Sequence, residues 1–179
     1  MSIKQLNGTL FEEMVRAGLI NLQNAEEEVN RLNVFPVADG DTGTNMCLTL
    51  GHGIRMAKSS VSAANYLRDL SGGMLLGARG NSGVILSQLF KGIYLELAGC
   101  GIVNPGELRD ALIRGYKTAY LSVVKPVEGT ILTVAREGIE RIRSQITRGI
   151  TIETVMAMYL AEMRRSLAAT PELLPVLKE

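Results

Sequence analysis

Residues 33–45 read Asn-Val-Phe-Pro-Val-Ala-Asp-Gly-Asp-Thr-Gly-Thr-Asn, and the rest of the chain is organised around this stretch. Pro36 disfavours helical backbone at Phe35, and Gly40 and Gly43 allow the chain to bend where other residues cannot. The stretch also gathers acids, hydroxyls and amides within a few positions. It therefore predicts a structured polar loop that joins two helices.

Asp39 and Asp41 are the candidate functional centre of this loop. Carboxylates two positions apart in a turning segment can converge on one cation, and oxygen ligands without a nearby His or Cys suit magnesium better than zinc. A bare Asp-x-Asp is more often an ordinary turn, but the apolar lead-in at 34–37 would pack this loop against a core. An EF-hand is excluded, because Leu50 stands where its closing Glu would be. We therefore predict a phosphate held by magnesium.

Thr42, Thr44 and Asn45 stand where the next helix should begin. Their hydroxyls, amide and exposed backbone N–H groups could bind the oxygens of an anion. The alternative is that Thr42 or Thr44 simply caps the helix after a plain turn.

Two further polar segments precede expected helices. Residues 77–83 read Gly-Ala-Arg-Gly-Asn-Ser-Gly, which could present backbone N–H groups to phosphate or form a tight helix-to-helix turn. This segment is not a Walker loop, because no Gly-Lys-Ser/Thr follows, and no strand precedes it as a dinucleotide fingerprint requires. Residues 126–130, Pro-Val-Glu-Gly-Thr, form the third polar helix start.

The apolar residues recur with a period near 3.6 and not 2, which predicts an all-α fold without strands. Short connections make neighbouring helices antiparallel, as in an up-and-down bundle or barrel. Alternate connections then lie at one end, so the three polar helix starts should share a rim. The expected helices cover residues 10–23, 44–58, 62–78, 81–98, 105–123, 130–147 and 151–169, with a short acidic turn at 25–32.

Several local features refine these boundaries. Thr9 with Glu12 has the pattern of a capping box for the first helix. Pro171 is expected to end the last helix. His52 has no Cys or second His nearby and is expected to be a surface or packing residue and not a metal ligand.

The composition excludes several classes of function. Lys and Arg number 19 against 18 Asp and Glu, so the net charge of +1 gives no general attraction to nucleic acid. Aromatic residues make up only 4%, which disfavours base stacking. No stretch approaches the roughly 18 consecutive apolar residues of a membrane span. Cys47 and Cys100 lack metal-ligand spacing, and together these features predict a soluble cytoplasmic protein.

Four segments of the chain resemble the dihydroxyacetone kinase L-domain family, and in particular the nucleotide-binding domain of its fatty acid kinase branch. They are residues 32–37, 39–46, 77–84 and 128–130. Such proteins hold ATP at one rim of a closed barrel of antiparallel helices, with two magnesium ions between aspartates and phosphates. The resemblance covers nearly all of the chain and implies one domain over residues 1–179. The family continues past this point into an Asp-Ala-Gly-Gly-like loop and a closing helix, so we expect a truncated domain without its last helix.

The resemblance also implies roles for individual residues. Asp39 and Asp41 correspond to catalytic metal ligands, and Asn33 is the nearest counterpart of a third ligand, displaced by one residue. The remaining correspondences are a phosphate loop at Gly80, Asn81, Ser82 and Gly83, and nucleotide neighbours at Thr42, Thr44, Asn45, Gly129 and Thr130.

The activity that the resemblance implies is the ATP- and Mg²⁺-dependent phosphorylation of a fatty acid carried by a separate, DegV-like fatty-acid-binding protein. One alternative is the ADP/ATP-binding subunit of a dihydroxyacetone (glycerone) kinase, whose partner would carry a substrate-binding histidine. Another is a non-catalytic lipid-binding or interaction module, which would keep its activity without Asp39 or Asp41. The oligomeric state stays open, with a homodimer as one option.

Overall fold

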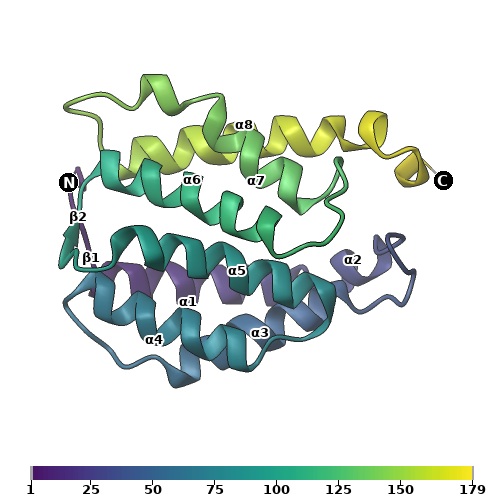
Figure 1. The fold of residues 1–179 in the computed structure, drawn as a ribbon, viewed down its shortest axis with the longest axis horizontal. Coiled ribbons are helices and arrows are strands. Elements are labelled where there is room, and N and C mark those ends of the chain that lie inside the picture. The colour runs from purple at the N-terminus through teal and green to yellow at the C-terminus, as the bar shows by residue number, and fades with distance from the viewer. Residues whose placement is uncertain (1, 179) are drawn as a thin grey trace.

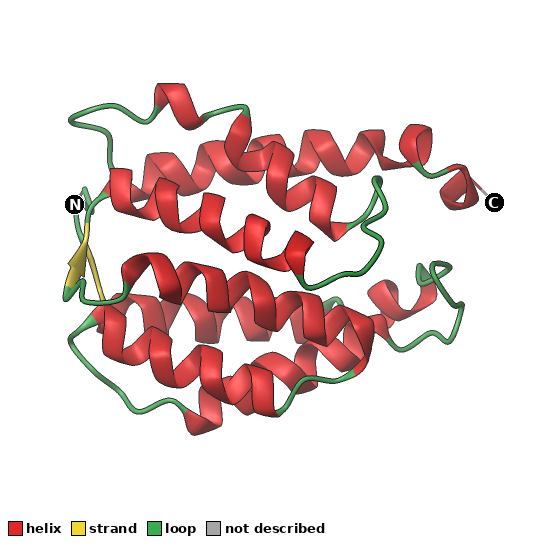
Figure 2. Ribbon diagram, in the orientation of Figure 1, coloured by secondary structure: helices red, strands yellow, loops and turns green. Residues whose placement is uncertain are grey.

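A computed structural model describes residues 2–178 of the chain, and most of these residues are helical (Figure 2). The all-α prediction is confirmed, and successive long helices run in opposite directions (Figure 1). The α-helices are α1 Gly8–Asn24, α2 Glu26–Arg31, α3 Thr42–Met56, α4 Ala63–Leu76, α5 Gly80–Leu97, α6 Pro105–Leu121, α7 Ile131–Glu140 and α8 Ile152–Leu173. Two short 3-10 helices cover Arg143–Gln145 and Pro175–Lys178.

The helices pack because each buries one apolar stripe, as their 3.6-residue period predicts. α1, α3, α4 and α5 form one packed group, and α6, α7 and α8 form another (Figure 1). α5 and α6 join the two groups through a close contact at two glycines. A Cβ on Gly92 of α5 would lie 2.7 Å from the Cα of Gly115 on α6, so only small residues allow this approach.

A two-stranded antiparallel ribbon closes the opposite end of the molecule from the polar helix starts. β1 (Leu6–Asn7) pairs with β2 (Ile102–Val103), and Leu6 opposes Val103. The expectation of no strands is wrong at this point, because a pairing of two residues per strand is too short to produce an alternating pattern. Both opposed residues are buried, so the ribbon ties the N-terminal segment to the core.

The start of α1 also differs from the expected one. Asn7 caps this helix by accepting the N–H of Leu10 at 3.0 Å, whereas Thr9 lies inside the helix. The expected capping box at Thr9 is therefore wrong by two positions. Asn is as good a capping residue as Thr, and the strand pairing of Asn7 fixes the extended backbone that a cap requires.

The last two helices depart from their expected ends for different reasons. α7 ends at Glu140 and not at 147, yet Ile142 and Ile146 remain buried, so the apolar pattern continued beyond the helix. α8 continues past Pro171 to Leu173. A proline at 171 leaves the carbonyl of Leu167 without its helical donor, and the Thr170 hydroxyl donates to that carbonyl at 2.8 Å instead.

The three polar helix starts lie at the same end of the molecule (Figure 1). The 33–41 loop, the α4–α5 connection and the α6–α7 connection all point toward the end where α8 finishes. This arrangement follows from the alternating helix directions, as the sequence predicted. Within residues 2–178, no helix is long and apolar enough to cross a membrane.

Candidate functional site

The 33–41 loop is held in shape by the side chain of Asn33. Its amide nitrogen donates to the carbonyl of Val37 at 2.9 Å, and its oxygen accepts the N–H of Asp41 at 3.3 Å. Gly40 has φ of +66°, a conformation that glycine adopts without strain. Asn33 therefore brings the two ends of the loop together. One lone pair of its side-chain oxygen is already occupied by the N–H of Asp41.

The first turn of α3 is capped by a residue of the preceding helix. Asn30 of α2 accepts the N–H groups of Gly43 and Thr44 at 2.7 and 3.2 Å, and its amide donates to the Thr44 hydroxyl at 3.0 Å. The N–H of Asn45 donates to the carbonyl of Asp41 at 2.8 Å. The expectation that Thr44 and Asn45 offer exposed N–H groups to an anion is therefore wrong. Of the two, Asn45 keeps a side chain that makes no hydrogen bond within residues 2–178, so it stays available for contact with a ligand.

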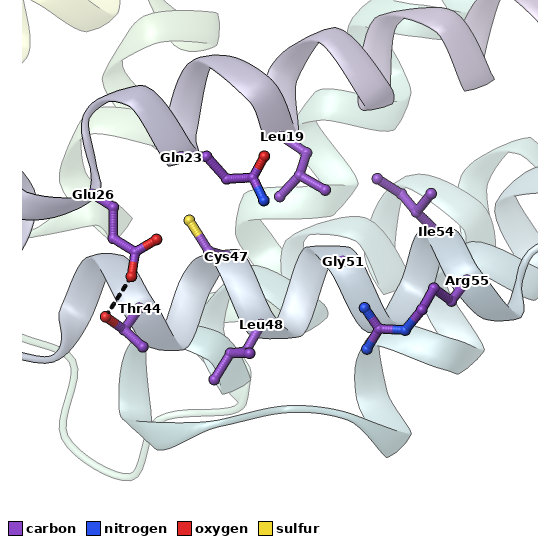
Figure 3. Close-up of a pocket in the computed structure, with 9 residues that line it drawn as sticks. All are labelled: Leu19, Gln23, Glu26, Thr44, Cys47, Leu48, Gly51, Ile54 and Arg55. Atoms are coloured by element: carbon purple, nitrogen blue, oxygen red, sulfur yellow. Dashed lines mark hydrogen bonds between the residues drawn. The ribbon is translucent and has the colours of Figure 1, made fainter.

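The Thr44 hydroxyl also donates to Glu26 at 2.7 Å (Figure 3). This bond makes Thr44 part of a network that runs from α2 to α3, a role that its sequence position does not indicate. Thr44 and Asn30 together thus fix where α3 begins relative to α2.

Asp39 and Asp41 flank Gly40 at the end of the loop. Within residues 2–178, no hydrogen bond or ion pair engages either carboxylate. Asp39 is exposed and Asp41 is half-buried, and the first turn of α2 adds three glutamates at 26–28. In the described part of the chain no three His, Cys, Asp or Glu side chains gather as a metal site. Two free carboxylates suit a cation that takes its other ligands from phosphate and water, as Mg²⁺ does.

The glycine-rich segment rests on one face of α3. Asn45, Thr49 and His52 are spaced four and three residues apart, so they project from the same side of that helix. A Cβ added to Gly80, Gly83 or Gly77 would overlap the side chain of Asn45, Thr49 or His52, respectively. These three glycines are therefore required by packing against α3. Packing against α3 therefore explains why residues 77, 80 and 83 are glycines, without a need for close contact with phosphate or for a tight turn.

His52 supports this segment as a packing residue, as expected. Its Nδ1 lies 2.8 Å from the carbonyl oxygen of Gly73, near the end of α4. Its ring fills the space that glycine leaves at position 77.

The first turn of α5 differs from the other two helix starts. Its N-cap residue, Arg79, makes no side-chain cap, and the first helical bond runs from the N–H of Gly83 to the carbonyl of Arg79 at 3.0 Å. The N–H groups of Gly80, Asn81 and Ser82 have no acceptor within residues 2–178. An uncapped helix start with three free N–H groups favours the binding of an anion, because free donors and the positive end of the helix dipole coincide there.

The third helix start is closed by its own side chains. Thr130 caps α7 by accepting the N–H of Leu132 at 3.4 Å, and Gly129 donates to the Thr133 hydroxyl at 2.8 Å. Gly129 has φ of +82°, and a Cβ there would lie 2.7 Å from the Cβ of Leu174. Gly129 and Thr130 thus shape the turn, and the N–H of Gly129 is taken by the Thr133 hydroxyl.

Glu128 is the charged centre of this turn. It accepts hydrogen bonds from Thr133 at 2.6 Å, Arg136 at 2.8 Å and Tyr120 at 3.1 Å. Burial raises the pKa of Glu128, but these three hydrogen bonds and the charge of Arg136 outweigh it and hold the pKa below its ordinary value. The carboxylate is therefore a stable anchor between α6 and α7.

A cavity of about 290 Å³ lies between α1, α2 and α3 (Figure 3). Its wall includes Glu26, Thr44 and the thiol of Cys47. Burial, followed by a hydrogen bond to Glu26 and the charge of Glu26, raises the pKa of Cys47 to about 11. The thiol is consequently protonated near neutral pH and is a poor nucleophile.

Sequence reasoning missed Asn30, Thr49 and the partners of Glu128. Thr49 could have been found, because it follows Asn45 by four residues and so lies on the same helix face. Asn30 and Arg136 could not, because they act across turns whose geometry has no local pattern.

The fold and site define a helical domain in which an uncapped helix start and a loop with two unpaired aspartates lie at the same end of the molecule. The model of the DAK2 domain family matches residues 36–179, so the chain belongs to that family. The family is associated with the nucleotide-binding subunits of kinases.

Curated relatives align with the whole chain. Protein YloV of Bacillus subtilis is 46% identical over 181 residues, covering 100% of this chain and 33% of that protein. An uncharacterized protein of Staphylococcus saprophyticus is 44% identical over 179 residues, covering 99% of this chain and 32% of that protein. An uncharacterized protein of Staphylococcus aureus is 42% identical over the same length. The chain thus spans about a third of these relatives.

Proposed function

We propose that this chain is the nucleotide-binding domain of a kinase that transfers a phosphoryl group from MgATP to a fatty acid. The acceptor would be the carboxylate of a fatty acid carried by a separate, DegV-like fatty-acid-binding protein. The observation that carries the proposal is the uncapped first turn of α5, which packs on Asn45 of α3, four residues after the unpaired carboxylate of Asp41.

Each part of this end of the molecule has a role in the proposal. The N–H groups of Gly80, Asn81 and Ser82, with the Ser82 hydroxyl, bind phosphate oxygens. Asp39 and Asp41 hold Mg²⁺, and the remaining lone pair of the Asn33 oxygen is a candidate third contact. Bound Mg²⁺ supplies charge neutralisation at the phosphates. Thr42, Thr44 and Asn45, in the first turn of α3 after Asp41, are proposed as neighbours of the bound nucleotide.

The chain needs no general base for a carboxylate acceptor, because that acceptor is already ionised at neutral pH. Catalysis then depends on holding the phosphates and the acceptor in line and on balancing charge. Two carboxylates and ATP repel each other until a cation lies between them, so the site is expected to be metal-dependent. Gly129 and Thr130 contribute by fixing the turn on the other side of this end.

Exposed apolar side chains at the same end support a protein partner that delivers the acceptor. They follow or flank the three polar connections, where a soluble monomer would more often place polar residues. They are Leu32, Val34, Val37, Leu75, Leu76, Val84, Leu121 and Val124. A carrier docked over them would exclude water from the transferring phosphate.

The direct test is formation of acyl phosphate from oleate by the full-length protein, ATP and purified DegV-like proteins, with Mg²⁺ or with excess chelator. We expect transfer only with Mg²⁺ and a carrier. Asp41→Asn should lower transfer by about 10² or more, the scale for losing one electrostatic element of a transition state. Asp110→Asn is the matched control, because Asp110 lies on α6 paired with Arg109. No transfer under any condition, or equal transfer by Asp41→Asn, contradicts the proposal.

A further inference from the structure

Thr49 is a buried hydroxyl that joins two backbones of the candidate site. Its side chain has 0% of its surface exposed. The hydroxyl donates to the carbonyl of Asn45 at 2.7 Å and accepts the N–H of Arg79 at 3.1 Å. One bond stays within α3, and the other reaches the residue that starts α5. Thr49 therefore bridges the helix that follows Asp41 and the helix start with free N–H groups.

We infer that Thr49 is a positioning residue, which sets the first turn of α5 at a fixed place relative to Asp39 and Asp41. This inference rests on the proposed function, in which the two sides grip the same nucleotide. Thr49 itself need not touch the nucleotide.

The chemistry of the bridge explains why a hydroxyl is needed. The Arg79 N–H requires an acceptor, and the Asn45 carbonyl can take a further donor besides its helical one. Only a group that donates and accepts at once satisfies both, and a hydroxyl does so. An aliphatic side chain of the same shape would leave the Arg79 N–H without its partner, at the cost of an unmade hydrogen bond.

The position of Arg79 determines where the free donors of α5 lie. Its carbonyl accepts the N–H of Gly83, so Arg79 forms one end of the first helical bond. Gly83 in turn packs directly on the Thr49 side chain. Thr49 thus contacts the first turn of α5 at both of its ends. A shift of this turn would move the N–H groups of Gly80, Asn81 and Ser82 together, and misplacement of about 1 Å is enough to weaken catalysis.

The experiment compares Thr49→Val, which removes the hydroxyl but keeps the shape, with Thr49→Ser, which keeps the hydroxyl. Thr118→Val is the matched control. Thr118 on α6 also donates to a carbonyl four residues back, that of Arg114 at 2.8 Å, and also faces a glycine of another helix, Gly92. It lacks a bond to a loop N–H. If Thr49→Val does not fold, Thr49→Ala removes the same hydroxyl without added bulk.

Two readouts are measured on each variant. Calorimetry with ATP and Mg²⁺ gives nucleotide affinity, and NMR hydrogen exchange without nucleotide gives the protection of the Arg79 amide. We expect Thr49→Val to bind MgATP about tenfold more weakly, the scale of one lost hydrogen bond, and to exchange the Arg79 amide faster. Thr49→Ser and Thr118→Val should match the wild-type protein in both.

The outcomes separate this inference from the proposed function. Wild-type affinity and unchanged Arg79 protection in Thr49→Val would overturn the role of Thr49. Faster exchange with unchanged affinity would also overturn it, because the position of the turn would then not matter for binding. If the wild-type protein binds no nucleotide, the proposed function fails and the positioning inference fails with it. If the wild-type protein binds MgATP and Thr49→Val binds it equally well, only the role of Thr49 fails.

Discussion

The side-chain oxygen of Asn30 accepts the backbone N–H of Gly43 at 2.7 Å, so the helix after the acidic loop is capped from the helix before it. Gly43 is buried, and a Cβ there would lie 2.5 Å from the carbonyl of Glu26. The same Asn30 oxygen accepts the N–H of Thr44. The two ends of the 33–41 loop are therefore held together by α2 and α3. The carboxylates of Asp39 and Asp41 are not needed to hold the loop in shape.

This relationship predicts the effect of Asn30→Ala. Loss of a residue that caps two N–H groups should lower the free energy of unfolding by about 1–2 kcal/mol. Urea denaturation measures this change. Asn21→Ala is the control, because Asn21 is exposed on α1 and its side chain makes no hydrogen bond within residues 2–178. Equal stability of Asn30→Ala and the wild-type protein would show that Asn30 does not cap α3.

Gly83→Ala should destabilise the protein even without nucleotide. Its Cβ would overlap the Thr49 hydroxyl, and overpacking of a well-filled contact costs about 1–3 kcal/mol. Thermal denaturation of the nucleotide-free protein checks this. Gly72→Ala on α4 serves as the control, because a Cβ there would meet nothing within 4 Å. If Gly83→Ala kept its stability and lost only ATP binding, the glycine would serve phosphate and not packing.

The helical periodicity was sufficient to predict the all-α class and the approximate span of most helices. It failed where structure depends on partners distant in sequence. The β1–β2 pairing joins Leu6 with Val103 through two residues per strand, and no alternation can be seen over that length. α7 was placed too long, because the buried Ile142 and Ile146 keep the pattern after the helix has ended.

The site followed the same division. The rim position of the acidic loop and of residues 80–83 follows from helix direction, which the sequence determines. Whether each N–H group at these helix starts is free or hydrogen-bonded cannot be predicted from helix direction. Asn30 removes those of Gly43 and Thr44 from the candidate anion site, whereas Arg79 leaves those of α5 free. Such capping across a turn depends on tertiary geometry.

The depressed pKa of Glu128 predicts a pH-dependent loss of stability. A carboxylate whose pKa is lowered on folding stabilises the protein above its unfolded pKa, about 4.3, and this contribution disappears as the pH falls through the folded pKa. Glu128→Gln should therefore be less stable than the wild-type protein at pH 7. The difference should shrink as the pH falls below about 4. Urea denaturation across this range measures it, and a difference that stayed constant with pH would contradict the assignment.

Calorimetric titration of ATP into the protein, with Mg²⁺ and with excess chelator, tests the central claim most directly. The account predicts binding with Mg²⁺ and a fall in affinity of at least about tenfold with chelator, because two unpaired carboxylates repel the phosphates when no cation intervenes. Asp41→Asn should weaken binding in Mg²⁺ while its melting temperature without metal stays unchanged or rises. Equal ATP affinity with Mg²⁺ and with chelator would contradict a site at which Asp39 and Asp41 hold nucleotide through a metal ion.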